Sequence, residues 1–431
     1  MSLLPTDWSC DRLKDAAVIN GESLAAETDA DYQFDYLEIS NVGYHGIVDP
    51  NAIERLRFED APSRARRRVA SKSTVISSVR PNLQAVAYVD EARKDFVCST
   101  GFNVVQPLEH RLLPKFAYRV LMSEAARQHF ESTAKGVGYP AVDDKDFGSL
   151  AIPLPSLAEQ RRIAAYLDAS CAAIDAAVAA KRRQLEALDS LAFTAVQRAV
   201  TQGINPDVVL KPCDLDWLPR VPKHWEVRQI KRRCQLLRGK FSHRPRNDPA
   251  LYDGEYPFVQ TGDITSAEKY IRTYSQTLNE LGFAVSRTFP KGTLVMSIAA
   301  NVGDVAILDF EACFPDSMVG LVPDHQTGLD YLYYLMRAMK PVMLRSAVLT
   351  TQLNLNYVRI GTNFAPFPPR AEQQEIAEYL DAKLADLKRL GAMIENQITT
   401  LTLYRKSLIH ECVTGQRRVT DADVQRVTAH G

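Results

Sequence analysis

The sequence predicts an α+β fold: two repeated α+β globular domains separated by two long antiparallel helices, which form a pseudo-twofold-symmetric coiled coil. A helix-opening motif around Glu159 recurs around Glu372, at an offset of 213 residues (372 minus 159). A tryptophan-containing segment around Trp8 recurs around Trp225, at an offset of 217 (225 minus 8). Because both the helices and the segments before them repeat, one structural unit is present twice.

The two copies set the predicted domain boundaries. We expect a first globular domain at 1–155, a central long helix at 156–203, a second globular domain at 204–368, a C-terminal long helix at 369–415 and a tail at 416–431. A chain of 431 residues is long enough for each globular domain to bury its own core.

Each globular domain is expected to contain short strands, turns and one modest helix. Runs with the composition of a short buried strand follow Lys-Ser or Lys-Gly turn signals, at 72–79 in the first domain and 291–298 in the second. The helical segments are predicted at about 116–130 and about 328–343.

The long helices carry their own start and stop signals. Ser156 followed by Glu159 predicts a capping box, in which hydroxyl and carboxylate satisfy reciprocal backbone donors. Pro369 replaces the serine in the second copy and is well tolerated at a first helical position. Gly203 and Gly415 provide the stops.

Between these signals, apolar residues alternate by four and three, which is typical of a coiled-coil seam. The members are Leu167, Ile174, Val178, Leu185 and Leu188 in the first helix and Leu380, Leu384, Leu387, Ile394, Ile398, Leu401 and Leu408 in the second. We expect Lys181, Gly391 and Arg405 to weaken the seam locally and to fix its register. From the pattern alone, simple dimerisation is an equally good interpretation.

Composition favours an ordinary soluble protein, with 46% hydrophobic and 24% charged residues. No apolar run approaches the roughly 20 residues that span a bilayer, and the N-terminus resembles no signal peptide, so we expect a cytoplasmic location. The seven cysteines never form a Cys-x-x-Cys pair, and the eight histidines lack metal-ligand spacing. We therefore expect reduced thiols and no metal site.

Basic residues gather in two runs, although 52 basic and 52 acidic residues leave no net charge. The phosphate-binding candidates are Arg64, Arg66, Arg67, Arg68 and Lys72, then Arg228, Lys231, Arg232, Arg233, Lys240, Arg244 and Arg246. Guanidinium and ammonium groups bind phosphate oxygens and release counterions. A solvated surface is the usual alternative, but both runs lie outside the helices, which favours nucleic acid.

Catalytic motifs are missing from the sequence. It has no P-loop, no Gly-x-Gly-x-x-Gly dinucleotide loop and no Asn/Asp-Pro-Pro-aromatic loop for a flipped base. Asp143-Asp144-Lys145 has the composition of half a nuclease site, but acidic loops are common. We expect a chain without catalytic residues that binds no cofactor itself.

These motifs together carry a family resemblance. Each long helix opens with Pro-x-Pro-x-x-Ala-Glu-Gln-x-x-Ile-Ala-x-Tyr-Leu-Asp-Ala, and Trp217-Leu218-Pro219 precedes the second tryptophan segment. In this the chain resembles the specificity subunit of type I restriction-modification enzymes. The resemblance implies two target-recognition domains, each binding half of a split DNA sequence. It also implies two methyltransferase subunits and restriction/translocase subunits as partners, which would hold the adenosylmethionine, ATP and magnesium.

Within this family, recognition loops tend to follow the strands, which here points to 78–84, 135–139, 299–303 and 350–354. The base-reading candidates are Arg80, Asn82, Gln84, Tyr139, Asn301, Thr351, Gln352 and Asn354. Arginine suits guanine and carboxamides suit adenine in the major groove. A structural role in the turn is the alternative for each residue. The long helices would then set the spacer between the two half-targets.

Two rival functions remain from the sequence. A self-contained DNA-modifying enzyme would bind adenosylmethionine as a purified chain. A coiled-coil scaffold without DNA specificity would leave no footprint on duplex DNA.

Overall fold

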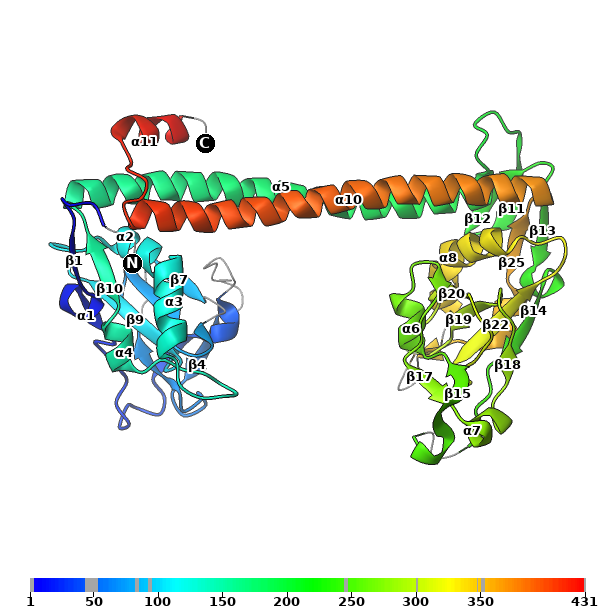
Figure 1. Ribbon diagram of the computed structural model, residues 1–431, viewed down its shortest axis with the longest axis horizontal. Helices are drawn as coiled ribbons and strands as arrows, with labels where there is room; N and C mark the ends of the chain where they lie inside the picture. The colour runs from blue at the N-terminus through cyan, green and yellow to red at the C-terminus, as the bar shows by residue number, and fades with distance from the viewer. Residues whose placement is uncertain are drawn as a thin grey trace. The chain divides into compact units, whose positions relative to one another are not determined.

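The computed structural model describes residues 4–42, 53–81, 85–91, 95–243, 247–299, 301–346, 348–349 and 353–429. Some base-reading and phosphate-binding candidates lie outside these residues: Asn82, Gln84, Arg244, Arg246, Thr351, Gln352 and the side chain of Asn354. The predicted fold class is confirmed, since two α+β domains and two long helices are present (Figure 1).

The chain divides into two compact units. Unit 1 comprises Met1–Arg182 and Glu395–Gly431, and unit 2 comprises Arg183–Ile394. Two long helices, α5 (Leu157–Gln202) and α10 (Arg370–Val413), each contribute one part to each unit. Within each unit the α5 and α10 segments lie side by side and antiparallel (Figure 1). Both helices begin and end within two residues of the predicted bounds.

Unit 1 contains one antiparallel sheet, one mixed sheet and a short ribbon. One sheet has the order β2 (Ala17–Ile19), β9 (Phe102–Pro107), β6 (Ser73–Ser77), β7 (Val86–Val89). The other has the order β4 (Glu54–Arg57), β3 (Gln33–Leu37), β8 (Phe96–Ser99), β5 (Ala65–Arg68), and the ribbon pairs β1 (Ser9–Arg12) with β10 (Ala151–Leu154). The helices are α1 (Leu13–Ala16), η1 (Ile39–Asn41), α2 (Pro114–Leu121), α3 (Glu124–Thr133), α4 (Asp144–Gly148) and α11 (Asp421–Thr428).

Unit 2 repeats this plan. One sheet has the order β14 (Cys234–Arg238), β22 (Met318–Pro323), β19 (Leu294–Ser297), β20 (Val305–Leu308), β16 (Tyr270–Ile271), and the other β17 (Gln276–Leu278), β15 (Tyr252–Phe258), β21 (Ala312–Cys313), β18 (Thr288–Phe289). The strand pairs are β11 (Leu210–Leu215) with β12 (Leu218–Pro222), β13 (Glu226–Gln229) with β25 (Phe364–Phe367), and β23 (Val348–Leu349) with β24 (Leu353–Asn354). The helices are η4 (Ile230–Arg232), η5 (Pro249–Leu251), α6 (Thr261–Ser266), α7 (Glu280–Ala284), α8 (Leu329–Ser346) and α9 (Tyr357–Thr362).

The strands predicted from the repeat occupy equivalent places. β6 lies antiparallel between β7 and β9, and β19 lies antiparallel between β20 and β22. The prediction of one helix at about 116–130 is wrong, because that segment holds two helices, α2 and α3. Ser123 starts the second one, since its side chain accepts a hydrogen bond from Ala126 N and caps a new helix.

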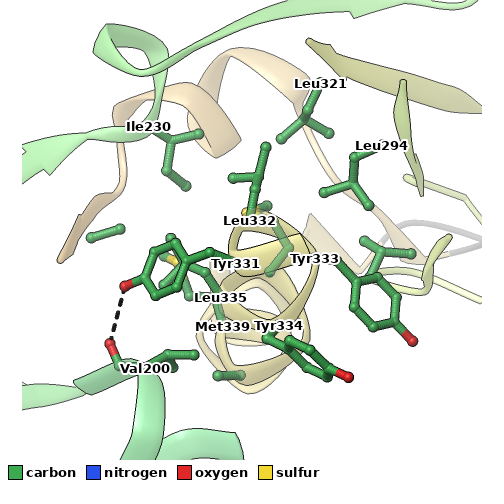
Figure 2. Packing of buried hydrophobic residues seen from close by; sticks show 14 of the residues in the cluster. Val200, Ile230, Leu294, Leu321, Tyr331, Leu332, Tyr333, Tyr334, Leu335 and Met339 are labelled. Atoms are coloured by element: carbon green, nitrogen blue, oxygen red, sulfur yellow. Dashed lines mark hydrogen bonds between the residues drawn. The ribbon is translucent and has the colours of Figure 1, made fainter. Parts of the chain in front are cut away.

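The core of unit 2 forms around α8 (Figure 2). Leu332 on α8 and Leu294 and Leu321 on the sheet are fully buried and belong to one cluster. Tyr331, 1% exposed, donates its hydroxyl to Pro366 O at 2.8 Å and also lies 3.4 Å from Val200 O of α5. Burying each of these leucines stabilises the fold by about 1.5–3 kcal/mol. The Tyr331 contacts with Pro366 and Val200 then orient the globular part of unit 2 on α5.

A buried glutamine from the repeated motif fastens each long helix to its globular domain. Gln160 donates from Nε2 to Arg111 O at 2.9 Å and Pro155 O at 3.0 Å, and its Oε1 accepts from Leu113 N at 2.8 Å. Gln373 makes the same three kinds of bond in unit 2. Its partners are Gln326 O at 3.0 Å, Pro368 O at 2.8 Å and Gly328 N at 2.6 Å.

An aspartate of the same motif makes a second attachment, with different partners in the two units. Asp168 accepts from Lys115 Nζ at 3.1 Å and from Arg119 Nη2 at 2.7 Å. Asp381 accepts from Lys269 Nζ at 2.8 Å and from the Tyr334 hydroxyl at 2.5 Å; Lys269 directly precedes β16, and Tyr334 lies on α8.

The predicted capping box at the start of α5 forms only in part. Glu159 N donates to Ser156 Oγ at 3.3 Å, as predicted. The Glu159 carboxylate instead accepts from Trp8 Nε1 at 3.1 Å and pairs with Arg418 at 3.1 Å. The predicted reciprocal bond is therefore wrong, because two distant partners bind this buried carboxylate.

The seam is most deeply buried where the globular domains cover it. Leu167, Ile174 and Val178 of α5 are buried in unit 1, whereas Leu185 and Leu188 of unit 2 are half-buried. On α10, the buried members are Leu380, Leu387 and Leu408, while Leu384, Ile394, Ile398 and Leu401 are half-buried. The long helices thus gain much of their burial from the domains, in addition to their seam.

One interruption of the seam is an ion pair within unit 1. Arg405 of α10 is 5% exposed, and its Nε lies 3.1 Å from Asp175 Oδ1 of α5.

By length and composition, α5 contains an 18-residue window of mean hydropathy 1.5 that could cross a bilayer. The expectation that no apolar run approaches that length is corrected accordingly. The alanine-rich helix nevertheless carries Asp168 and Asp175, and both bind basic residues of the same unit.

Candidate nucleic-acid interface

In each unit, the described parts of the predicted recognition loops are joined next to the end of an equivalent strand. In unit 1, Val142 N donates to Ser78 O at 2.9 Å, which joins the segment after 135–139 to the start of 78–84. In unit 2, Leu355 N donates to Ile298 O at 3.0 Å and makes the corresponding join. In each unit, therefore, the described ends of the two loop segments are adjacent.

In each unit, the first loop of the pair begins at a buried serine that ends the central strand. The Ser77 hydroxyl donates to Val79 O at 2.7 Å, and the Ser297 hydroxyl donates to Ala299 O at 2.7 Å. These serines are 6% and 0% exposed, respectively. Because a hydroxyl bonded two residues ahead fixes a turn locally, both loops leave the sheet in a defined direction.

The structure brings together the two described base-reading candidates of unit 1. The Arg80 guanidinium carbon lies 4.5 Å from the centroid of the Tyr139 ring, which is 73% exposed. Arg80 N donates to Pro140 O at 2.8 Å, and its φ of +48° places it in the left-handed region. Among the described residues no acidic side chain pairs with Arg80. Its guanidinium is thus held over an aromatic ring with its N–H groups available.

In unit 2, the described candidate Asn301 is exposed at the tip of the β19–β20 loop. Its Nδ2 donates to Thr265 Oγ1 of α6 at 2.9 Å. The loop tip is therefore attached to a neighbouring element through the candidate side chain itself.

Acidic groups beside the unit 1 loops have structural roles. Asp143 Oδ1 accepts from Asp146 N at 2.8 Å and caps α4. Lys135 Nζ lies 2.7 Å from Asp143 Oδ2 and 2.9 Å from Asp146 Oδ2. The hydrogen bond from Lys135 lowers the pKa of Asp143, and the two carboxylates raise the pKa of Lys135. These groups close the 135–141 loop. Among the described residues, no three His, Cys, Asp or Glu side chains gather to hold a metal ion.

The first basic run largely binds its own domain. Arg64 hydrogen-bonds Glu38, and Lys72 Nζ lies 3.4 Å from Glu109, on the surface in both cases. Cation–π contacts hold two others, with the guanidinium carbon of Arg66 4.5 Å from the Phe58 ring centroid and that of Arg68 5.5 Å from the Tyr32 ring centroid. Exposed pairs of this kind are weak, about 0–1 kcal/mol, so they still leave cations available to phosphate.

One arginine in each run is engaged inside its domain. Arg67, with 15% of its side chain exposed, donates to Asn103 Oδ1 at 2.8 Å. Arg233, also 15% exposed, pairs with Glu226 at 2.7 Å and with Asp324 at 3.9 Å. For these two residues the structural interpretation is favoured over phosphate binding.

Apart from Arg228 and Arg233, the described phosphate-binding candidates of the second run have no acidic partner among the described residues. Arg228 pairs with Glu226 at 3.4 Å. Lys231, Arg232 and Lys240 are exposed, and none of them forms an ion pair among the described residues. They are the phosphate-binding candidates best supported by the structure.

A lysine outside both runs occupies the position equivalent to Lys231. In unit 2, a Cβ on Gly361 of α9 would lie 3.2 Å from Lys231 Cβ, and in unit 1 a Cβ on Gly148 of α4 would lie 3.2 Å from Lys14 Cβ. Lys14 is exposed and forms no ion pair among the described residues. The clustering of basic residues along the sequence could not identify Lys14, but the repeat, which matches Lys14 to Lys231, could have done so.

Comparisons with known proteins agree on one family. The family described as the type I restriction modification DNA specificity domain matches residues 5–187 and 222–400. The putative type I restriction enzyme MjaX specificity subunit of Methanocaldococcus jannaschii is 23% identical, over 96% of this chain and 95% of that protein. The HindI specificity subunit of Haemophilus influenzae is 20% identical, over 83% and 89%.

Solved structures show the same fold. A chain from a structural study of complex assembly and conformational transition of the type I R-M system superposes with a TM-score of 0.77 and 22% identity, over 96% of this chain and 99% of that chain. The HsdS subunit from Thermoanaerobacter tengcongensis has a TM-score of 0.54 and 21% identity, over 96% and 98%.

Proposed function

This chain belongs to the type I restriction modification DNA specificity domain family, and we propose from that premise that it is the DNA sequence-recognition subunit of a type I restriction-modification complex. It reads a bipartite target with a fixed spacer and directs partner methyltransferase and restriction subunits to that target. The observation that carries this proposal is the matched pair of loops in each unit, launched from equivalent strands by Ser77 and Ser297.

Each pair of loops suits the major groove, whose base edges distinguish all four base pairs. In unit 1 the stacked Arg80 offers a planar fork for the O6 and N7 acceptors of guanine. In unit 2 the Asn301 carboxamide offers a donor and an acceptor for adenine. Lys231, Arg232 and Lys240 provide phosphate contacts that hold unit 2 on the duplex.

The two long helices set the spacer between the half-targets. α5 contains 46 residues and α10 contains 44, and each is a single helix without a break. At about 1.5 Å of rise per residue, the length of a helix is determined by its residue count. An insertion of about four residues, near one turn or 6 Å, should therefore change the preferred spacer by one or two base pairs.

Partner subunits supply the chemistry in this proposal. Two methyltransferase subunits hold adenosylmethionine, restriction/translocase subunits hold ATP and magnesium, and this chain acts in the cytoplasm without catalysing a step. Exposed apolar side chains on the long helices support docking of partners. They are Leu191, Phe193, Leu390 and Met393 in unit 2 and Leu403 and Tyr404 in unit 1.

The test is to express this chain with its methyltransferase subunits and map the methylated adenines in the host genome. We expect one split motif with a constant spacer and no methylation when this chain is omitted. Methylation without any shared motif would contradict the proposal. Adenosylmethionine binding by the purified chain alone would instead support a self-contained enzyme.

A further inference from the structure

The β19–β20 loop of unit 2 is fixed at both ends. Ile298 and Val302 are 4% and 3% exposed and belong to the unit 2 core. Gly303, with φ of +89°, closes the turn and donates from N to Ser297 O at 2.9 Å. Because buried residues flank Asn301, its backbone position is determined by the core.

A chain of polar contacts also fixes the Asn301 side chain. Asn301 Nδ2 donates to Thr265 Oγ1 at 2.9 Å, and that oxygen lies 3.2 Å from Asp304 Oδ2. Asp304 Oδ1 in turn accepts from Lys340 Nζ of α8 at 2.5 Å. The stem of Lys340 packs on Gly303, where a Cβ would lie 2.9 Å from Lys340 Cγ. Three elements therefore determine the orientation of one exposed carboxamide.

The contact with Thr265 uses one N–H group of the Asn301 carboxamide; its other N–H group and its oxygen have no hydrogen-bond partner among the described residues. A carboxamide has two N–H groups and one carbonyl oxygen, so Asn301 keeps one N–H and its oxygen. Adenine offers N7 as acceptor and N6 as donor on its major-groove edge, which is the complementary pattern. Lys340 neutralises the Asp304 carboxylate, so this loop does not bring an unpaired negative charge toward DNA phosphates.

We propose that Thr265, Asp304 and Lys340 are positioning residues that orient Asn301 to read an A·T pair in the half-target of unit 2. This inference rests on the proposed function and adds a named base pair and three residues to it. The two units then differ in what they read, because unit 1 presents the stacked Arg80 at its own loop.

The experiment uses the complex of the full chain with its methyltransferase subunits and a duplex library randomised across the target. Sequencing the methylated molecules gives the discrimination at every position. Asn301→Ala should lower the preference for A·T at one position of one half-target by about tenfold to a hundredfold. Thr265→Val, which removes the hydroxyl but keeps the shape, should lower it at the same position by about three- to tenfold.

Thr265→Ser is the matched control, because it keeps the hydroxyl and should retain the wild-type preference. Lys340→Met should lower the preference for A·T at the same position, since it releases the Asp304 carboxylate that contacts Thr265, and should also weaken methylation of all sequences, since it leaves that carboxylate unpaired. If Asn301→Ala leaves every position unchanged, or only lowers the melting temperature, the inference is wrong and Asn301 is a turn residue. If the wild-type complex selects no sequence at all, the proposed function itself fails.

Discussion

The two units attach the long helices with one element that is identical in both and one that differs. Gln160 and Gln373 bind only backbone groups, and each makes three bonds of the same kinds. Asp168 and Asp381 bind side chains, and their partners are different residue types: Lys115 and Arg119 of α2 for the first, and Lys269 before β16 with Tyr334 of α8 for the second.

This difference has a physical reason. Backbone N–H and C=O groups stay the same whatever the side chains are, so a glutamine that binds them fits any sequence with the same local path. A carboxylate that binds side chains requires a particular residue at a particular place. Backbone-bound anchors therefore repeat between the copies, whereas side-chain pairs diverge.

The comparison predicts its largest effect at the glutamines. Gln160→Leu and Gln373→Leu should each lower the free energy of unfolding by about 2–4 kcal/mol, because each leaves buried backbone groups without partners. Chemical denaturation of the full chain measures both. Gln374→Leu is the control, because Gln374 is exposed beside Gln373, and a change within about 0.5 kcal/mol is expected. A large loss at only one of the two buried glutamines would contradict the equivalence of the anchors.

The recognition loops provide the second comparison, since the loop after Ser77 in unit 1 presents Arg80 and the loop after Ser297 in unit 2 presents Asn301. Arg80→Ala should remove about 1–3 kcal/mol of discrimination at one guanine of the target while leaving the other half-target unchanged. Arg80→Lys keeps the charge but loses the planar fork, so it should retain DNA affinity and still lose discrimination. The methylation profile of the randomised library measures both variants. Equal loss at both half-targets would contradict a separate reader in each unit.

Much of the fold was predictable because it is carried by spacing along one chain. The repeat located both long helices within two residues and the strands β6 and β19 in equivalent places. It also placed the loop pairs, because a loop that follows a repeated strand must itself be repeated.

The role of each basic residue was not predictable, because it depends on contacts between distant segments. Arg67 and Arg233 lie in basic runs, yet tertiary partners hold both inside their domains. Glu159 likewise binds Trp8 and Arg418, which are remote in sequence. A local capping rule contains no information about such partners.

The third comparison concerns the two repeated tryptophans. Trp8 Nε1 donates to the buried Glu159 carboxylate, whereas Trp225 Nε1 is buried without a hydrogen-bond partner among the described residues. In unit 2 the equivalent Glu372 accepts from His224 at 2.8 Å. Trp8→Phe should therefore cost about 1–3 kcal/mol more than Trp225→Phe, since only the first removes a bond to a charged group. Denaturation of both variants decides this, and equal costs would contradict it.

The smallest expected effect is the pH dependence of the unit 2 attachment. Burial alone would raise the pKa of Asp330, but hydrogen bonds from Lys269 and Tyr270 outweigh it and hold that pKa below its usual 3.8. A carboxyl group with a lowered pKa in the folded state stabilises the protein above pH 3.8 and loses this contribution as the pH falls through the folded-state value. Asp330→Asn should therefore make the free energy of unfolding less sensitive to acid below about pH 4. Denaturation curves of both proteins over that range measure the difference, and parallel pH profiles would show that Asp330 does not contribute to the acid sensitivity.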